Sequence, residues 1–212
     1  MAFTAQDVKA LREKTGVGMM ECKKALVEAD GDMDKAVDFL RERGLAAAQK
    51  KATRIAAEGV VLPYYDAQAK KGVVVEVNSE TDFVAKNEKF MNFVEGVAKT
   101  ILATNPADVE ALKEEKFDGT DRTVTETLND LVLSIGENMK VRRFERMDGV
   151  VSTYIHGGGS VGVMVGFDVA DESKASAPEF DAMGKNVAMQ IAAMSPAYLD
   201  EASVPAEVRS EE

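Results

Sequence analysis

The chain has 212 residues, enough for one or two compact domains with a buried core. Its 26 basic and 37 acidic side chains give a net charge of −11, which disfavours general nucleic-acid binding because that depends on lysine and arginine. The single cysteine, Cys22, cannot form an internal disulfide. No signal peptide is recognisable, and no apolar run approaches the ~20 residues of a membrane span. We therefore expect a cytoplasmic protein that contacts neither membranes nor, directly, nucleic acid.

Residues 1–45 predict a bundle of three short helices. Thr4 and Asp7 have the spacing of a capping box, and apolar residues then recur at helical intervals. A second helix begins at Met19, and Asp32 can cap a third. Gly44 is placed to end that third helix as a C-cap.

Residues 46–57 are rich in alanine, lysine and arginine and contain no proline or glycine, so we interpret them as a helical linker. The charge also changes here, because residues 1–57 carry +2 and the remainder −13. Such a shift favours a domain boundary.

The rest of the chain contains an internal repeat at a constant offset of 90 residues. Matched pairs include Tyr64 with Tyr154, Gly72 with Gly162, Phe90 with Phe180, and Ile101 with Ile191. Each copy predicts a β-hairpin followed by one helix, and two such units can pair or pack into a shared core. Between the copies we expect a helix over 120–134 and a strand over 138–147. The predicted fold is α+β, with core subdomains at 58–147 and 148–212.

A glycine-rich stretch imitates two catalytic motifs. Gly157, Gly159 and Gly162 fit the dinucleotide pattern G-x-G-x-x-G, but that motif must open a helix and here a β-rich run follows. Ser160 fits the hydrolase pattern G-x-S-x-G, which needs a histidine late in the chain, whereas the only histidine is His156. A flexible hairpin is the favoured interpretation, and a hydrolase using Ser160 and His156 is a weak alternative.

Other catalytic signals are absent from the sequence. There is no phosphate-binding G-x-x-x-x-G-K-[ST] loop, and one histidine with one cysteine disfavours structural zinc. We expect a binding protein without catalytic residues, cofactor or metal.

The repeat is interrupted at residues 78–87, where Phe83 has no counterpart in the second copy. Phe83 either tucks into the local core, as most apolar loop residues do, or stays exposed for a partner. Asp82 beside it either caps the following helix or contacts that partner.

Four segments resemble the elongation factor Ts family, in family order over nearly the whole chain: residues 11–26, 78–87, 136–143 and 154–157. The resemblance implies a guanine nucleotide exchange factor for elongation factor Tu. It implies an N-terminal three-helix domain similar to ubiquitin-associated (UBA) domains, followed by a core of two related subdomains.

The resemblance also implies residue roles. One segment is expected to enter elongation factor Tu near its nucleotide and help dislodge Mg²⁺: Asp82, Phe83, Val84 and Ala85. A second set is expected to contact the GTPase domain: Arg12, Met19, Met20 and Lys23. A third is expected to contact another domain of the partner: His156 and Gly157. Judged from the residues alone, Arg12 equally fits a solvated helix face, and at least one of Met19 and Met20 should be exposed.

Many family members continue past the position of Val208 into a coiled coil or further elements. The resemblance therefore implies either a naturally short form or a missing C-terminal segment, and it leaves a homodimer open. The rival hypothesis is an adaptor whose helical bundle binds ubiquitin-like or nascent-chain partners.

Overall fold

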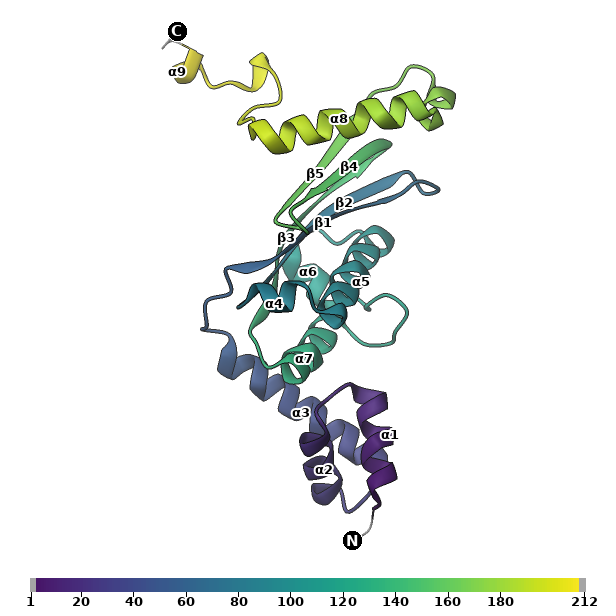
Figure 1. Ribbon diagram of the computed structural model, residues 1–212, viewed down its shortest axis with the longest axis vertical. Helices are drawn as coiled ribbons and strands as arrows, with labels where there is room; N and C mark the ends of the chain where they lie inside the picture. Colours follow the sequence, from purple (N-terminus) through teal and green to yellow (C-terminus); the bar gives the residue numbers. More distant parts are fainter. Residues whose placement is uncertain (1–2, 210–212) are drawn as a thin grey trace.

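The computed structural model describes residues 3–209 and has an elongated arrangement of helices and strands (Figure 1). The N-terminal end is formed by α1 (Ala5–Thr15), α2 (Met19–Glu28) and α3 (Met33–Lys51). The first sheet contains β1 (Glu58–Asp66), β2 (Lys71–Ser79) and β3 (Met139–Asp148), and the second contains β4 (Val150–His156) and β5 (Val161–Phe167). The mixture of helix and strand confirms the α+β prediction.

The remaining elements lie between and after the strands. Between β2 and β3 they are α4 (Asp82–Ala85), α5 (Glu88–Thr104), α6 (Val109–Glu114) and α7 (Val124–Ile135). After β5 they are η1 (Glu172–Ser176), α8 (Pro178–Met194), η2 (Glu201–Ser203) and α9 (Ala206–Arg209). The expected N-terminal and C-terminal domains also include residues 1–2 and 210–212, which lie outside the described range. Within residues 3–209, no helix combines the length and apolarity needed to cross a membrane.

The helix starts predicted in the bundle are confirmed. The Thr4 backbone N–H donates to Asp7 Oδ2 at 2.7 Å, while Thr4 Oγ1 accepts from the Asp7 backbone at 3.3 Å. The Asp32 carboxylate accepts the backbone N–H groups of Asp34 and Lys35 at 3.1 Å each. These bonds satisfy amide donors that the first helical turn leaves unpaired.

The predicted end of the third helix at Gly44 is wrong, because α3 continues to Lys51. Gly44 instead faces α7, where an added Cβ would lie 3.2 Å from the carbonyl oxygen of Asn129. The glycine therefore permits close helix packing rather than ending the helix. The expected helical linker over 46–57 is helical only as far as Lys51, and residues 52–57 leave the helix to enter β1.

The elements predicted between the repeats exist with shifted bounds. The expected helix over 120–134 begins later, at Val124, because Thr123 and Glu126 form a capping box there. The expected strand over 138–147 is β3, which spans Met139–Asp148.

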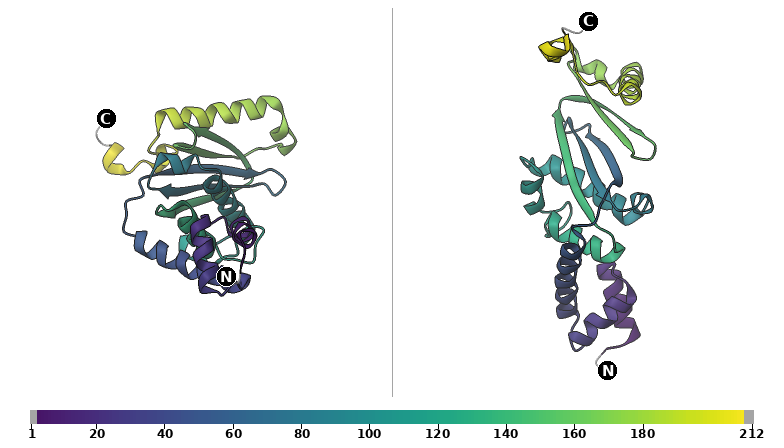
Figure 2. Two further views of the ribbon diagram at one scale, coloured as in Figure 1. Left: turned by 60° about the horizontal axis from the view of Figure 1, so that its bottom comes forward. Right: turned by 90° about the vertical axis from the view of Figure 1, so that its left-hand side faces the viewer.

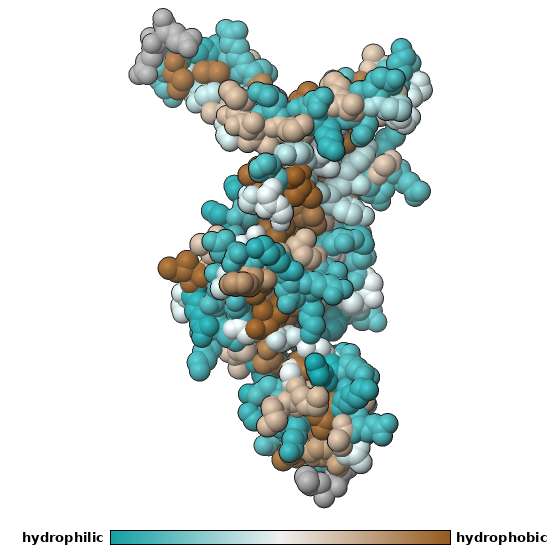
Figure 3. Space-filling model, viewed as in Figure 1, coloured by the Kyte–Doolittle hydropathy of each residue, from teal (hydrophilic) through white to brown (hydrophobic). Residues whose placement is uncertain are grey.

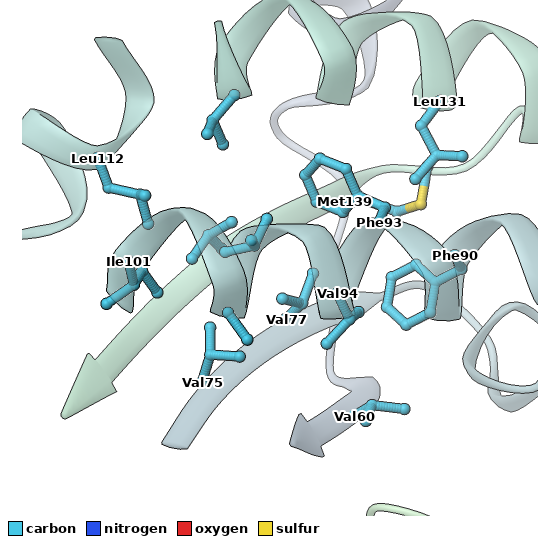
Figure 4. Packing of buried hydrophobic residues seen from close by; sticks show 14 of the residues in the cluster. Val60, Val75, Val77, Phe90, Phe93, Val94, Ile101, Leu112, Leu131 and Met139 are labelled. Carbon is cyan, nitrogen blue, oxygen red and sulfur yellow. The ribbon is translucent and has the colours of Figure 1, made fainter. Parts of the chain in front are cut away.

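The core is layered as helix, sheet, sheet and helix (Figure 2). All strand pairs are antiparallel, and β2 lies between β1 and β3. The main apolar cluster lies between α5 and the first sheet, where Phe90, Val94 and Ile101 meet Val75 and Val77 (Figure 4). The helix α8 covers the second sheet, and its Phe180 ring meets Phe167 edge-on at 5.3 Å between centroids.

The two hairpin-and-helix units follow the same spacing along the chain. Helices α5 and α8 begin 90 residues apart, at Glu88 and Pro178, and end 90 apart, at Thr104 and Met194. The matched glycines Gly72 and Gly162 both lie where the hairpins face each other. An added Cβ would lie 2.8 Å from Met164 Sδ at Gly72 and 2.7 Å from Val61 Cγ1 at Gly162. Glycine at both positions thus lets the sheets approach closely.

Gly96 provides a stability test of the main core. It faces Phe117, whose ring stacks on Phe93 at 5.5 Å, and an added Cβ would overlap the Phe117 ring. Alanine normally favours a helix over glycine by ~1 kcal/mol, but overpacking costs ~1–3 kcal/mol. Because the added Cβ would lie inside the Phe117 ring, the overpacking cost should fall at the upper end of that range, ~2–3 kcal/mol, and we expect Gly96→Ala to lower the free energy of unfolding by about 1–2 kcal/mol in urea denaturation. Asn92→Ala, at an exposed position of the same helix, is the control and should not destabilise. A Gly96→Ala protein as stable as wild type would contradict this packing.

Candidate partner interface

The helix α4 presents one apolar side chain outward and two inward. Phe83 is 80% exposed, whereas Val84 is buried in the main core and Ala85 packs against it. The alternative that Phe83 tucks into the core is therefore wrong. Val84 and Ala85 anchor the helix that carries the exposed ring.

Asp82 does not cap a helix. Thr81 is the N-cap residue of α4, and Asn87 caps α5 by accepting the Lys89 backbone N–H at 2.9 Å. The Asp82 carboxylate instead pairs with Lys86 Nζ at 3.1 Å, with both side chains largely exposed. This exposed i,i+4 pair adds little stability, so Asp82 is available to a partner.

Glu137 holds the start of α4. Its two carboxylate oxygens accept the Thr81 backbone N–H at 3.0 Å and the Thr81 hydroxyl at 2.8 Å. The Ser79 hydroxyl donates to the Thr81 carbonyl at 3.0 Å. Glu137 lies in the family-like segment 136–143, but the sequence does not show its role, because its partner lies 56 positions away.

The residues predicted on the bundle are all exposed. On α2, Met19 and Met20 are 47% and 65% exposed, and Lys23 lies one turn further along the same helix. Arg12 is exposed on α1. Neither Arg12 nor Lys23 forms an ion pair with any residue in the described range. The solvated-face interpretation of Arg12 thus agrees with the isolated chain and leaves its charge free for a partner.

The bundle residues that point inward are Leu11, Cys22 and Leu26, all fully buried. Burial raises the pKa of the Cys22 thiol, against smaller opposing effects from the Thr15 hydroxyl and Arg12. A buried thiol with a raised pKa is chemically inert, so Cys22 has a packing role.

His156 lies at the exposed end of β4, and its Nδ1 atom is 3.0 Å from the Tyr154 hydroxyl. Ser160 Oγ donates to the backbone carbonyl of His156 at 3.2 Å, not to the imidazole. The next residues, Gly157, Gly158 and Gly159, have φ of 57°, 66° and 104°, a backbone that favours glycine. The strand β5 follows this turn. The dinucleotide-binding and hydrolase motifs both need a helix at this place, so neither is formed here.

Two of the three predicted groups lie at the same end of the core. The Gly159 carbonyl accepts the Val61 backbone N–H at 2.8 Å, which docks the His156–Gly157 turn beside the start of β1. The start of β1 pairs with the end of β2, immediately before α4. The bundle residues lie apart from both groups, at the N-terminal end of the molecule (Figure 1).

A hydrogen-bonded clasp joins the bundle to the core. Lys89 Nζ of α5 donates to the Gly16 carbonyl at 2.7 Å and to Ser134 Oγ at 3.1 Å, and Ser134 Oγ donates to the same carbonyl at 2.8 Å. Gly16 lies between α1 and α2, beside a cavity of about 350 Å³. The clasp therefore fixes how the bundle is presented relative to α4.

Among the side chains that the structure describes, which exclude that of Glu172, no three His, Cys, Asp or Glu gather into a group that could hold a metal. The exposed groups are apolar, cationic and hydrogen-bonding side chains. Such a set suits protein recognition.

Comparison with known proteins identifies the family. Residues 80–212 match the family described as Elongation factor TS. The Elongation factor Ts of Clostridium perfringens (strain SM101 / Type A) is 55% identical, across 97% of this chain and 67% of the relative. That of Syntrophotalea carbinolica is 51% identical, across 100% of this chain and 69% of the relative. The chain belongs to the elongation factor Ts family. This family member spans about two thirds of the length of these relatives.

Removing the Glu137 carboxylate should loosen α4. In Glu137→Ala the partly buried Thr81 amide and hydroxyl lose their carboxylate acceptor, and a hydrogen bond to a charged group contributes ~1.5–3 kcal/mol. We expect hydrogen exchange of the Thr81 amide to accelerate about tenfold or more. The Val94 amide, in the middle of α5, is the internal control and should not change. Unaltered Thr81 exchange would show that Glu137 does not hold this segment.

Proposed function

We propose that the protein is a guanine nucleotide exchange factor for elongation factor Tu, without bond chemistry or a cofactor of its own. The exposure of Phe83 supports this proposal most strongly. Its ring is 80% exposed, although its neighbour Val84 is buried and Glu137 fixes the start of the helix. Holding a large apolar ring in water is unfavourable for an isolated protein. Membership of the elongation factor Ts family supports the choice of partner.

Phe83 acts as a wedge in this proposal. Mg²⁺ links the nucleotide phosphates to a GTPase and offsets their charge, so displacing the loops that hold Mg²⁺ weakens nucleotide binding. Entry of the Phe83 ring between packed elements of the partner shifts those loops. Asp82, Val84 and Ala85 accompany it, with Asp82 exposed and the other two supporting the helix.

Burial of the Phe83 ring alone cannot supply the free energy that a large change in nucleotide affinity requires. Burying one phenylalanine contributes ~1.5–3 kcal/mol. A ~10⁴-fold shift between two states requires ~5.5 kcal/mol of differential binding. Further surfaces must therefore bind the partner, and the exposed residues already described provide them. Met19, Met20, Lys23 and Arg12 dock on the GTPase domain, while His156 and Gly157 dock on another domain.

The architecture supports this division of labour. The three-helix bundle, which has its own apolar cluster around Leu11 and Leu26, is proposed to be a UBA-like docking module. The two hairpin-and-helix units are proposed to be duplicated subdomains, on the strength of their constant 90-residue spacing. We place the protein in the cytoplasm, where its proposed partner acts in translation.

An adaptor function is the second candidate, because the bundle exposes Met20 and Val27 as well as charged groups. An adaptor differs from an exchange factor because it need not change the rate of nucleotide release. A homodimer is compatible with either function.

The decisive test is the release of a fluorescent GDP from purified elongation factor Tu in excess unlabelled GDP. We expect acceleration by wild type at substoichiometric amounts and at least about tenfold less by Phe83→Ala at saturation, because the wedge energy is lost. The melting temperature should not change, since the ring is exposed. Leu199→Ala, another exposed apolar position, should behave as wild type. GDP release rates that are equal with Phe83→Ala and with wild type would exclude a wedge role for Phe83. No acceleration of GDP release by wild type would favour the adaptor function.

The bundle is tested by charge reversal. Lys23→Glu should raise the half-saturating concentration about tenfold, with the maximal release rate nearly unchanged, because docking charges act mainly on encounter and affinity. Lys185→Glu makes the same change at an exposed position of α8 and is the matched control. Equal behaviour of both variants would remove α2 from the interface.

A further inference from the structure

Three segments meet at one end of the first sheet. Glu58, the first residue of β1, pairs with Ser79, the last residue of β2, and Ser79 pairs with Met139, the first residue of β3. The residues just before β1, just after β2 and just before β3 therefore lie together. Only the second of these segments carries Phe83.

A polar cluster ties the three segments to one another. The Arg54 carbonyl accepts the Asn138 side-chain amide at 2.8 Å, and Arg54 Nη1 lies 3.5 Å from Glu80 Oε1. Glu80 Oε1 also accepts the Asn138 backbone N–H. Asn138 is only 7% exposed and forms the buried centre of the cluster, whereas the Arg54 and Glu80 side chains are 49% and 22% exposed. The cluster fixes the backbone immediately before Ile55 and three residues before Phe83.

Ile55 is 85% exposed. A single exposed apolar residue is ordinary in a folded protein. In residues 3–209, however, only Ile55, Phe83 and Leu199 among the large apolar side chains are 80% exposed or more, and the first two flank this cluster. Figure 3 shows apolar surface projecting at the left edge of the core, at the height of the connection between α3 and β1.

We propose that Ile55 is a second apolar anchor for the protein that Phe83 enters, and that the Arg54–Glu80–Asn138 cluster keeps the two backbone segments that carry these side chains together. The inference rests on the proposed function, so the occupant is an apolar depression on elongation factor Tu beside the site of Phe83. Continuity with the Phe83 segment selects this partner over a second copy of the chain. Anchors held rigidly before binding lose little conformational freedom when they dock, which raises affinity. Ile55 also adds differential contact of the kind that Phe83 alone cannot supply.

The experiment compares Ile55→Ser with Leu199→Ser, a similar apolar-to-serine substitution at a highly exposed position in the connection between α8 and η2. Binding to nucleotide-free elongation factor Tu and fluorescent GDP release are measured with the full chain. We expect Ile55→Ser to weaken binding about tenfold with an unchanged melting temperature. Leu199→Ser should match wild type, and Ile55→Leu should restore binding to within about twofold, because it keeps the apolar volume.

Three outcomes would overturn the inference. If wild type accelerates release and Ile55→Ser binds as tightly as wild type, Ile55 is not an anchor although the proposed function stands. If Ile55→Ser alters self-association in sedimentation while partner binding is unchanged, the surface serves a second copy. If wild type neither binds nor accelerates release, the proposed function fails and the anchor fails with it.

Discussion

The burial of α5 against the three-stranded sheet is the interaction on which the rest of the structure depends. It places Phe90, Val94 and Ile101 over Val75 and Val77 and excludes water from one face of the sheet. With that face buried, the register of the strands is fixed, because a slip of one residue would turn Val73, Val75 and Val77 of β2 away from α5. The register in turn aligns the ends of β1, β2 and β3, where the candidate interface is built.

At that end of the sheet, hydrogen bonds hold the backbone segments in place, while the apolar side chains of Phe83 and Ile55 are exposed. Glu137 accepts two hydrogen bonds from Thr81, and Asn138 is bonded to the segments on either side. Asn138 is buried, so removing one of its partners would leave a desolvated polar group unpaired, which is costly. These bonds lie next to the backbone that carries the exposed side chains of Phe83 and Ile55. The Lys89 and Ser134 side chains likewise tie the bundle to the core through the Gly16 carbonyl, next to the surface proposed as a second contact.

Local chemistry decided the features that were predicted correctly. Thr4 with Asp7, and Asp32, cap helices through partners within three residues, so their spacing in the sequence is sufficient. The structure departed from the sequence pattern where distant residues decide the outcome. Gly44 suggested a helix end, but close packing on α7 required glycine within the helix. For Asp82 the sequence allowed either a helix cap or a partner contact, and the cap positions are occupied by Thr81 and Asn87.

The sequence by itself determined the α+β class, the helix starts of the bundle, the constant spacing of the hairpin-and-helix units and the family resemblance, because each rests on short-range pattern or direct likeness. Tertiary structure alone decided that Phe83 is exposed, that Glu137 holds its helix, and that Ile55 lies beside the same cluster. Those facts join residues as far apart as Arg54 and Asn138, whose proximity depends on how the strands pair. Strand pairing is a property of the buried face as a whole, so no single segment contains it.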